Sequence, residues 1–255
     1  MILYISGNGG FTNESGVIWG SGTSSDPYII AGWEINASTA HGIYIENADV
    51  YFVIRDCYIY DDGTGSFYSI FLQNCRNGNL SNNRCTNAYE KIFLLQSNNN
   101  IIINNNCSSG FNTGEGIYLD SSSNNTITNN TCLGNYDGIY LGWDSNNNIL
   151  SNNNCSNNWY GILLDSSNNN TLSNNNCSSN KWYGILLTSD SSSSPSSNNT
   201  IIWNQIFDNL GYGIILDSYT SYNVIHNNTF YHNNGSGDVY DPSHVQAYDD
   251  GTNNR

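Results

Sequence analysis

Short apolar runs with an alternating pattern recur along this 255-residue chain. Ile117-Tyr-Leu119 and Ile162-Leu-Leu164 are examples, and clusters of Ser, Asn and Gly separate such runs. Alternation with period two over a few residues predicts short β-strands, and the polar clusters predict turns. No stretch has a sustained helical period, so the sequence predicts an all-β fold.

The apolar runs belong to a repeat of roughly 22 to 29 residues. Each repeat has a first anchor, usually glycine, and a second anchor, usually cysteine. The first anchors are Gly42, Ser69, Lys91, Gly116, Gly138, Gly161, Gly184 and Gly213, and the second are Cys57, Cys85, Cys107, Cys132, Cys155, Cys177, Ile206 and Phe230. A unit this short cannot bury a core alone, so successive units must stack.

Stacked units of two or three short strands, all running in the same direction, describe a parallel β-helix in which each strand pairs with its copy one rung away. We expect one right-handed solenoid of about eight to ten rungs over residues 1–255. Residues 1–40 would form an N-terminal cap and first rung, 41–234 the repeats, and 235–255 a C-terminal rung and tail. Asn tolerates left-handed corners, and Asn side chains stacked ~4.8 Å apart can form hydrogen-bonded ladders.

Net charge excludes one class of partner. The chain carries −15 with only six Lys and Arg residues, so binding to a phosphate backbone is disfavoured. No apolar run approaches the ~20 residues that span a bilayer. The first residues lack a basic flank and a long apolar stretch, so we expect either that a secretion signal was removed or that the chain belongs to a longer protein.

The cysteines allow three interpretations. Six of the seven lie in the inward column of second anchors, and Cys75 is displaced from it. They can be buried free thiols that act as small core residues, they can form a disulfide between rungs, or the thiol column can bind Cu(I) or Zn²⁺.

The segments GIYLDSSSNNTITNNTC and GILLDSSNNNTLSNNNC, with GSGTSSDPYIIAGW before them, resemble the NosD-like right-handed parallel β-helix proteins. Their carbohydrate-binding and sugar-hydrolysis type repeats are common in archaeal and bacterial surface proteins. The resemblance covers nearly the whole chain and implies this fold and a location outside the cell or at its surface. The same repeats occur in a copper-delivery accessory protein, in polysaccharide lyases and epimerases, and in surface proteins, so the resemblance transfers no catalytic residue.

Aromatic residues recur at positions expected to face solvent. One column, two residues after the first anchor, contains Tyr44, Phe71, Phe93, Tyr118 and Tyr140, and then becomes aliphatic at Leu163, Leu186 and Ile215. A second column, two residues before the anchor, includes Tyr136, Trp159 and Trp182. The rings can stabilise neighbouring rungs by stacking, or they can form an exposed platform that binds sugar rings or another protein.

Three carboxylates precede consecutive anchors, namely Glu90, Glu115 and Asp137, and Lys91 is adjacent to the first. Stacking at ~5 Å produces a repulsion of roughly 1–3 kcal/mol at surface-like dielectric constants. Solvent and outward splay of the side chains can relieve it, and so can a bound Ca²⁺. The third interpretation is a catalytic site with Glu90, Glu115, Asp137 and Lys91 as candidates, since two carboxylates ~5 Å apart suit a retaining glycosidase.

The sequence thus favours an extracellular or cell-surface structural and recognition module. Its partner would be a glycan or a neighbouring protein, including another copy of the chain, without a required cofactor. The first alternative is a polysaccharide-active enzyme, a lyase, epimerase or glycoside hydrolase, and the second is a copper-handling accessory protein.

Overall fold

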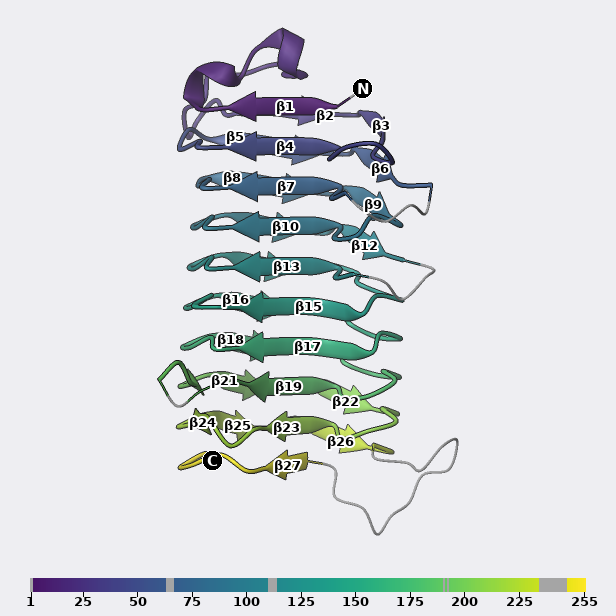
Figure 1. Ribbon diagram of the computed structural model, residues 1–255, viewed down its shortest axis with the longest axis vertical. Helices are drawn as coiled ribbons and strands as arrows, with labels where there is room; N and C mark the ends of the chain where they lie inside the picture. Colours follow the sequence, from purple (N-terminus) through teal and green to yellow (C-terminus); the bar gives the residue numbers. More distant parts are fainter. Residues whose placement is uncertain (1, 63–66, 110–113, 190, 192, 234–246) are drawn as a thin grey trace.

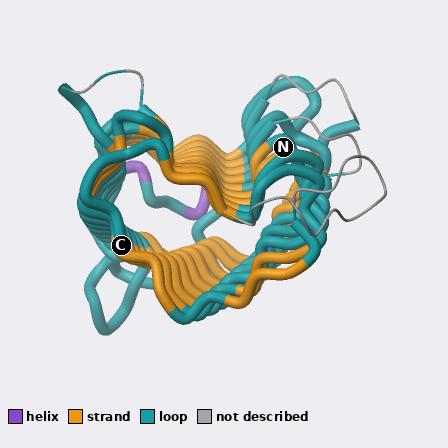
Figure 2. Tube along the Cα trace, turned by 90° about the horizontal axis from the view of Figure 1, so that it is seen from below, coloured by secondary structure: helices purple, strands orange, loops and turns teal. Residues whose placement is uncertain are grey.

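The computed structural model describes residues 2–62, 67–109, 114–189, 191, 193–233 and 247–255. Over these residues the chain winds into a right-handed parallel β-helix, as predicted (Figure 1). Seen along the long axis, the strands of successive rungs superimpose as bands (Figure 2). The strands pair parallel with their copies in neighbouring rungs because the repeat places equivalent residues side by side.

Ten strands form the largest sheet, one from each rung. They are β1 (Leu3–Ser6), β4 (Ile43–Glu46), β7 (Ile70–Gln73), β10 (Ile92–Leu95), β13 (Ile117–Asp120), β15 (Asp137–Gly142), β17 (Tyr160–Asp165), β19 (Ile185–Thr188), β23 (Ile214–Leu216) and β27 (Ala247–Asp249). The predicted alignment of repeats is confirmed here, since Tyr118 pairs with Phe93 on one side and with Tyr140 on the other.

A second sheet has nine strands. It contains β2 (Tyr28–Ala31), β5 (Phe52–Arg55), β8 (Gly78–Ser81), β11 (Ile101–Ile103), β14 (Thr126–Thr128), β16 (Ile149–Ser151), β18 (Thr171–Ser173), β21 (Thr200–Ile202) and β25 (Val224–His226). A short pair, β20 (Ser196–Ser197) with β24 (Thr220–Ser221), lies before β21 and β25 in the chain.

The third side of the solenoid is built from shorter strands. It contains β3 (Glu34–Asn36), β6 (Tyr58–Tyr60), β9 (Arg84–Thr86) and β12 (Asn106–Ser108), and further along β22 (Gln205–Phe207) and β26 (Thr229–Tyr231). Single bridges through Thr131, Asn154 and Asn176 connect the two groups. This side therefore continues through the middle rungs with less regular pairing.

The core is one continuous column of inward-facing side chains. The inward Ile and Leu residues of each rung, for example Ile117, Leu119 and Ile127, are fully buried. All seven cysteines are buried free thiols, which agrees with the first of the three predicted arrangements. Cys75 lies in a different column from the other six. Its N–H donates to Ser97 Oγ, the first of a column of serine side chains that are hydrogen-bonded from rung to rung.

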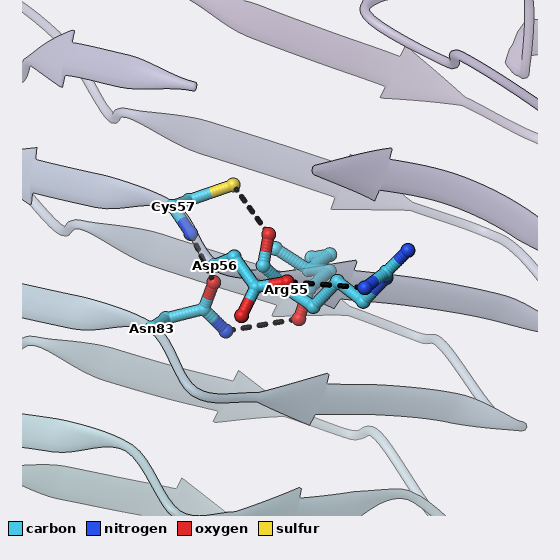
Figure 3. A network of polar contacts seen from close by, with 5 residues as sticks. Arg55, Asp56, Cys57 and Asn83 are labelled. Carbon is cyan, nitrogen blue, oxygen red and sulfur yellow. Dashed lines mark hydrogen bonds and ion pairs between the residues drawn. The ribbon is translucent and has the colours of Figure 1, made fainter. Parts of the chain in front are cut away.

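Asparagine ladders join the rungs at the corners. Figure 3 shows the start of one: Asn83 Oδ1 accepts from the Cys57 N–H at 3.1 Å, and Asn83 Nδ2 donates to the Ile54 carbonyl at 2.9 Å. This ladder continues through Asn105, Asn130, Asn153, Asn175, Asn204 and Asn228. The residue before each of these Asn has positive φ, as at Asn104 and Asn152. The first residue of each pair, an Asn except at Trp203, therefore makes the corner, and the Asn after it satisfies the buried backbone.

The N-terminal segment covers one end of the core. Two short 3₁₀ helices, η1 (Asn8–Gly10) and η2 (Asn13–Ser15), lie at the end of the solenoid next to β1 (Figure 1). Phe11, between them, packs on Tyr28 at 4.9 Å and on Phe52 at 5.5 Å between ring centroids. Residues 8–27 thus shield apolar surface that no further rung covers. The predicted boundary of the C-terminal rung and tail near residue 235 falls among residues 234–246, outside the described part.

Candidate functional site

The outer face of the ten-stranded sheet presents three parallel columns of side chains, and two of them contain most of the predicted site residues. The central column contains Tyr4, Tyr44, Phe71, Phe93, Tyr118, Tyr140, Leu163, Leu186, Ile215 and Tyr248. The anchor-side column contains the residues before the first anchors, His41, Tyr68, Glu90, Glu115, Asp137, Tyr160, Tyr183 and Tyr212. The strand-end column, two residues after the central one, contains Glu46, Gln73, Leu95, Asp120, Gly142, Asp165, Thr188, Asp217 and Asp250.

On the upper rungs the central column is a stack of parallel rings. From Tyr44 to Tyr140 the successive centroids lie 4.7, 5.0, 4.8 and 4.8 Å apart, and no pair of ring planes is tilted by more than 13°. Each ring therefore covers a face of the next. Only ring edges face solvent, so this stack is suited to holding rungs together.

The predicted exposure of this stripe is wrong for Phe71 and Phe93, which are each 8% exposed. The Tyr68 ring packs edge-on against both of them, at 5.2 and 5.1 Å. Tyr44, Tyr118 and Tyr140 are half-buried. An outward-facing position is thus buried here because the anchor-side column folds over it.

On the lower rungs the face opens into a groove. A cavity of about 550 Å³ is lined by Tyr183, Leu186, Thr188, Tyr212, Ile215, Asp217 and Tyr248. Leu186 and Ile215 form its floor, because they occupy the central column. The Tyr183 and Tyr212 rings are 6.1 Å apart and tilted by 39°, so they cover each other less than the rings above. The groove thus combines aliphatic surface, partly open tyrosine rings and, in the strand-end column, polar groups.

The second aromatic column lies beside the anchor-side tyrosines. Trp159 packs on Tyr136 at 5.8 Å and edge-on against Trp182 at 5.2 Å. Trp182 also meets Tyr160 edge-on, at 5.1 Å. Tyr136 and Trp182 are exposed to solvent. These residues therefore continue the aromatic surface of the lower rungs away from the groove floor.

The carboxylates at the anchor-side positions do not turn outward into solvent, which was one predicted way to relieve their repulsion. Glu90 is 5% and Asp137 2% exposed, while Glu115 is half-buried. Burial, with the nearby charge of Glu115, raises the pKa of Glu90 to about 9, and burial also raises the pKa of Glu115 and of Asp137. These shifts favour the neutral form of the carboxyl groups, and a neutral Glu90 relieves the repulsion between the first two of them.

Lys91 is fully buried. It takes the first-anchor position, which faces inward: at Gly116 a Cβ atom would lie 2.9 Å from the Cβ of Cys132. The Lys91 ammonium donates to the Tyr89 carbonyl at 3.4 Å. Burial lowers the pKa of Lys91 to about 8, although Glu115 opposes the shift. Lys91 thus lies beneath the carboxylates and not on the surface with them.

This arrangement does not favour a retaining glycosidase at these residues. The two carboxyl groups of such an enzyme lie ~5–5.5 Å apart and act separately as acid and nucleophile. Glu90 is instead buried, with its pKa raised to about 9, and burial also raises the pKa of Glu115, so both carboxyl groups are shifted away from the ionised form that a nucleophile needs. Within the described part of the chain, no three His, Cys, Asp or Glu residues are arranged to hold a metal ion. The calcium site at Glu90, Glu115 and Asp137 stays a prediction.

Comparison with protein families assigns the chain. The family described as "Periplasmic copper-binding protein (NosD)" matches residues 66–253, which is well over half of the chain. The chain belongs to the NosD family. A search of curated protein sequences found no significant match. For the described ranges, no helix has the length and apolar character needed to cross a membrane.

Solved structures similar to this NosD-family chain share its fold. The periplasmic alginate epimerase AlgG matches with a TM-score of 0.67 and 19% identity, over 78% of this chain and 50% of that one. The Dettilon tailspike protein matches with a TM-score of 0.64 and 20% identity, over 87% and 53%. An alginate lyase from Paenibacillus matches with a TM-score of 0.53 and 14% identity, over 88% and 99%. The chain thus spans half the length of the epimerase chain.

Copper is the metal in the NosD family description, and the described residues of this chain do not fit it. The thiol column is sealed from solvent, with Cys85, Cys107, Cys132, Cys155 and Cys177 all at 0% exposure. Burial raises the pKa of Cys107 and Cys155, whereas copper binds thiolates. Burial opposes ionisation of Cys132 too, but hydrogen bonds with Cys107 and Cys155 and the Lys91 charge lower its pKa. Buried thiols without access from solvent thus offer copper no set of thiolate ligands.

Proposed function

We propose that this NosD-family chain is a recognition module outside the cytoplasm that binds a polysaccharide lengthwise along the lower rungs of the ten-stranded sheet. The groove of about 550 Å³ carries this proposal. An apolar floor between partly open tyrosine rings and polar side chains suits a sugar ring, which has apolar C–H faces and polar edges. The periplasmic family description supports a location outside the cytoplasm.

The geometry also supports a linear polymer over a compact ligand. The groove follows the solenoid axis, and the central column continues from Leu186 upward through Leu163 to the Tyr140 ring. Each rung adds one similar step of ~4.8 Å, so successive sugar residues would meet successive rungs. The epimerase and lyase with this fold are named for alginate, a linear polysaccharide.

A glycan array followed by calorimetry tests the proposal. We expect at least one linear polysaccharide to bind and the double variant Tyr183→Ala/Tyr212→Ala to weaken that binding at least ~tenfold, as loss of central aromatic contacts does. Tyr231→Ala is the matched control, because Tyr231 is an exposed tyrosine stacked on Phe207 on another side of the solenoid. The proposal fails if no polysaccharide binds, or if the control loses as much affinity.

A polysaccharide-active enzyme is the second candidate. Glu90, with its pKa raised to about 9, remains protonated at neutral pH and can act as an acid, and half-buried Glu115 connects it to the surface. Shortened chains or newly formed reducing ends in any polysaccharide that binds would establish this function. Glu115→Gln should then abolish turnover and leave binding in the lower groove intact.

A further inference from the structure

One carboxylate, Asp217, lines the groove, and further carboxylates lie beyond it in the same strand-end column. In the strand-end column, Asp165 and Asp217 lie two rungs apart, a separation of about 9.6 Å at ~4.8 Å per rung, with Thr188 between them. Asp250 follows on the last rung. The groove and its approaches therefore carry negative charges on three of four successive rungs.

These carboxylates are bonded only to neutral donors. Asp165 accepts from Tyr140 Oη at 3.3 Å and from Ser166 Oγ at 2.9 Å. Asp217 accepts from Thr188 Oγ1 at 2.9 Å. Where the structure is described, the ion pairs are those of Asp56, Asp49 and Asp208, which lie outside the three columns. Among the described residues, no ion pair thus compensates the negative charge along the groove.

The basic residues are placed elsewhere, and all six lie in the described part of the chain. Lys91 is buried beneath the upper rungs. Arg55 and Arg76 pair with Asp56 and Asp49, Arg84 lies over the Tyr58 ring, Lys181 lies over the Trp159 ring, and Arg255 lies beside Ile225 of the nine-stranded sheet. None of them belongs to the central or strand-end column.

From this charge distribution we infer that the polysaccharide is cationic, a linear polymer of amino sugars whose ammonium groups pair with Asp165 and Asp217. This inference rests on the proposed function and names the substrate class of the same groove. A polyuronate would place its carboxylates against a groove without cations, so it would be repelled. Ammonium groups gain both ion pairing with the aspartates and contact with the open tyrosine faces.

Three hexasaccharides of matched length test the inference by calorimetry, namely glucosamine, N-acetylglucosamine and mannuronate oligomers at a pH that keeps the amino groups protonated. At low salt we expect the glucosamine oligomer to bind about tenfold more tightly than the N-acetylated one, and the mannuronate oligomer not to saturate. The preference should shrink at ~0.5 M salt, where screening shortens the range of the charges.

Paired variants separate specific binding from general attraction to an acidic protein. Asp165→Asn/Asp217→Asn should weaken binding of the glucosamine oligomer by a much larger factor than binding of the N-acetylglucosamine oligomer, so that most of the preference is lost. Asp56→Asn/Asp208→Asn makes the same change of charge away from the groove, at two positions with positive φ that Asn tolerates, and should change the preference by less than about twofold.

The outcomes distinguish the two proposals. Tighter binding of the N-acetylated or mannuronate oligomer, or an equal effect of both double variants, overturns the cationic-substrate inference while leaving polysaccharide binding in place. Absence of binding by all three oligomers and by every polysaccharide of the array overturns the proposed function itself.

Discussion

Asn153 offers the sharpest test of how the rungs are held together. Its side chain makes four hydrogen bonds: Nδ2 donates to the Ile127 carbonyl at 2.9 Å and to Asn175 Oδ1 at 3.0 Å, and Oδ1 accepts from Asn130 N at 3.0 Å and from Asn130 Nδ2 at 3.1 Å. The side chain is 1% exposed. Asn153→Ala therefore removes hydrogen-bond partners from buried donors and acceptors on the two neighbouring rungs.

The expected cost follows from these four bonds. A buried polar group that loses its partner costs ~1–3 kcal/mol, whereas a hydrogen bond whose loss is fully compensated by water costs only ~1 kcal/mol. For four bonds between these limits, Asn153→Ala should lower the free energy of unfolding by about 3–5 kcal/mol. The neighbouring Asn152 is the matched control. It is exposed, has φ +56° and lies in the same Asn run. Asn152→Ala should cost only the left-handed backbone strain, ~1–2 kcal/mol, and Asn152→Gly about zero.

Urea unfolding followed by circular dichroism measures the three free energies of unfolding. The reasoning requires Asn153→Ala to be clearly the most damaging, with equal m-values for the variants. If Asn153→Ala and Asn152→Ala agree within about 0.5 kcal/mol, the ladder does not supply the stability assigned to it here.

Two further predictions concern the buried titratable groups. Since the pKa of Glu90 is raised from 4.5 to about 9, the folded chain holds a proton that the unfolded chain releases between these values, so the free energy of unfolding should fall as pH rises through this range. Urea unfolding at several pH values measures this fall. In Glu90→Gln the free energy of unfolding should fall less steeply with pH, by up to ~1.4 kcal/mol per pH unit, and a slope equal to that of the unmodified chain would contradict the raised pKa of Glu90. The seven buried thiols should resist alkylation in the native protein and all react in denaturant. The native protein should also not take up Cu(I) in competition with a chelator, and stoichiometric loading with loss of thiol titre would contradict the sealed column.

Much of the fold could be read from the sequence because the repeat fixes the register. The spacing of the first anchors was enough to place Tyr118 beside Tyr140 and to align Cys85 with Cys107, and both pairings are present. The Asn ladders also followed, since paired Asn residues recur at the corners and the stacking distance suits their amides.

The site was harder to predict because facing outward is not the same as being exposed. Phe71 and Phe93 point away from the core, yet the Tyr68 ring covers them, and this packing depends on a neighbouring column. Sequence adjacency places Lys91 with the surface carboxylates. Glycine at the equivalent positions of other rungs indicates instead that this position faces inward, where there is little room for a side chain. These facts concern three-dimensional contacts between columns, which linear spacing does not contain.

The position of the groove is visible in the sequence as a change of residue type in two columns, and the number of aromatic residues alone does not show it. Leu163, Leu186 and Ile215 follow the stacked rings in the central column, while tyrosines take over the anchor-side column at Tyr160, Tyr183 and Tyr212. A switch from aromatic to aliphatic in one column, with the reverse change beside it, marks the point where the rings stop covering one another. That switch indicates the open section better than the number of aromatic residues does.

The ladders also bear on how such a chain can change its length during evolution. Each rung presents the same hydrogen-bonding groups above and below, so excision of residues 138–160 would join Asp137 to Gly161 and bring Asn130 onto Asn175 with equivalent partners. Duplication of a rung would insert a copy that is already compatible with both neighbours. Duplication or deletion of the coding sequence for a whole rung can thus lengthen or shorten the protein while the buried hydrogen bonds and the core packing stay of the same kind.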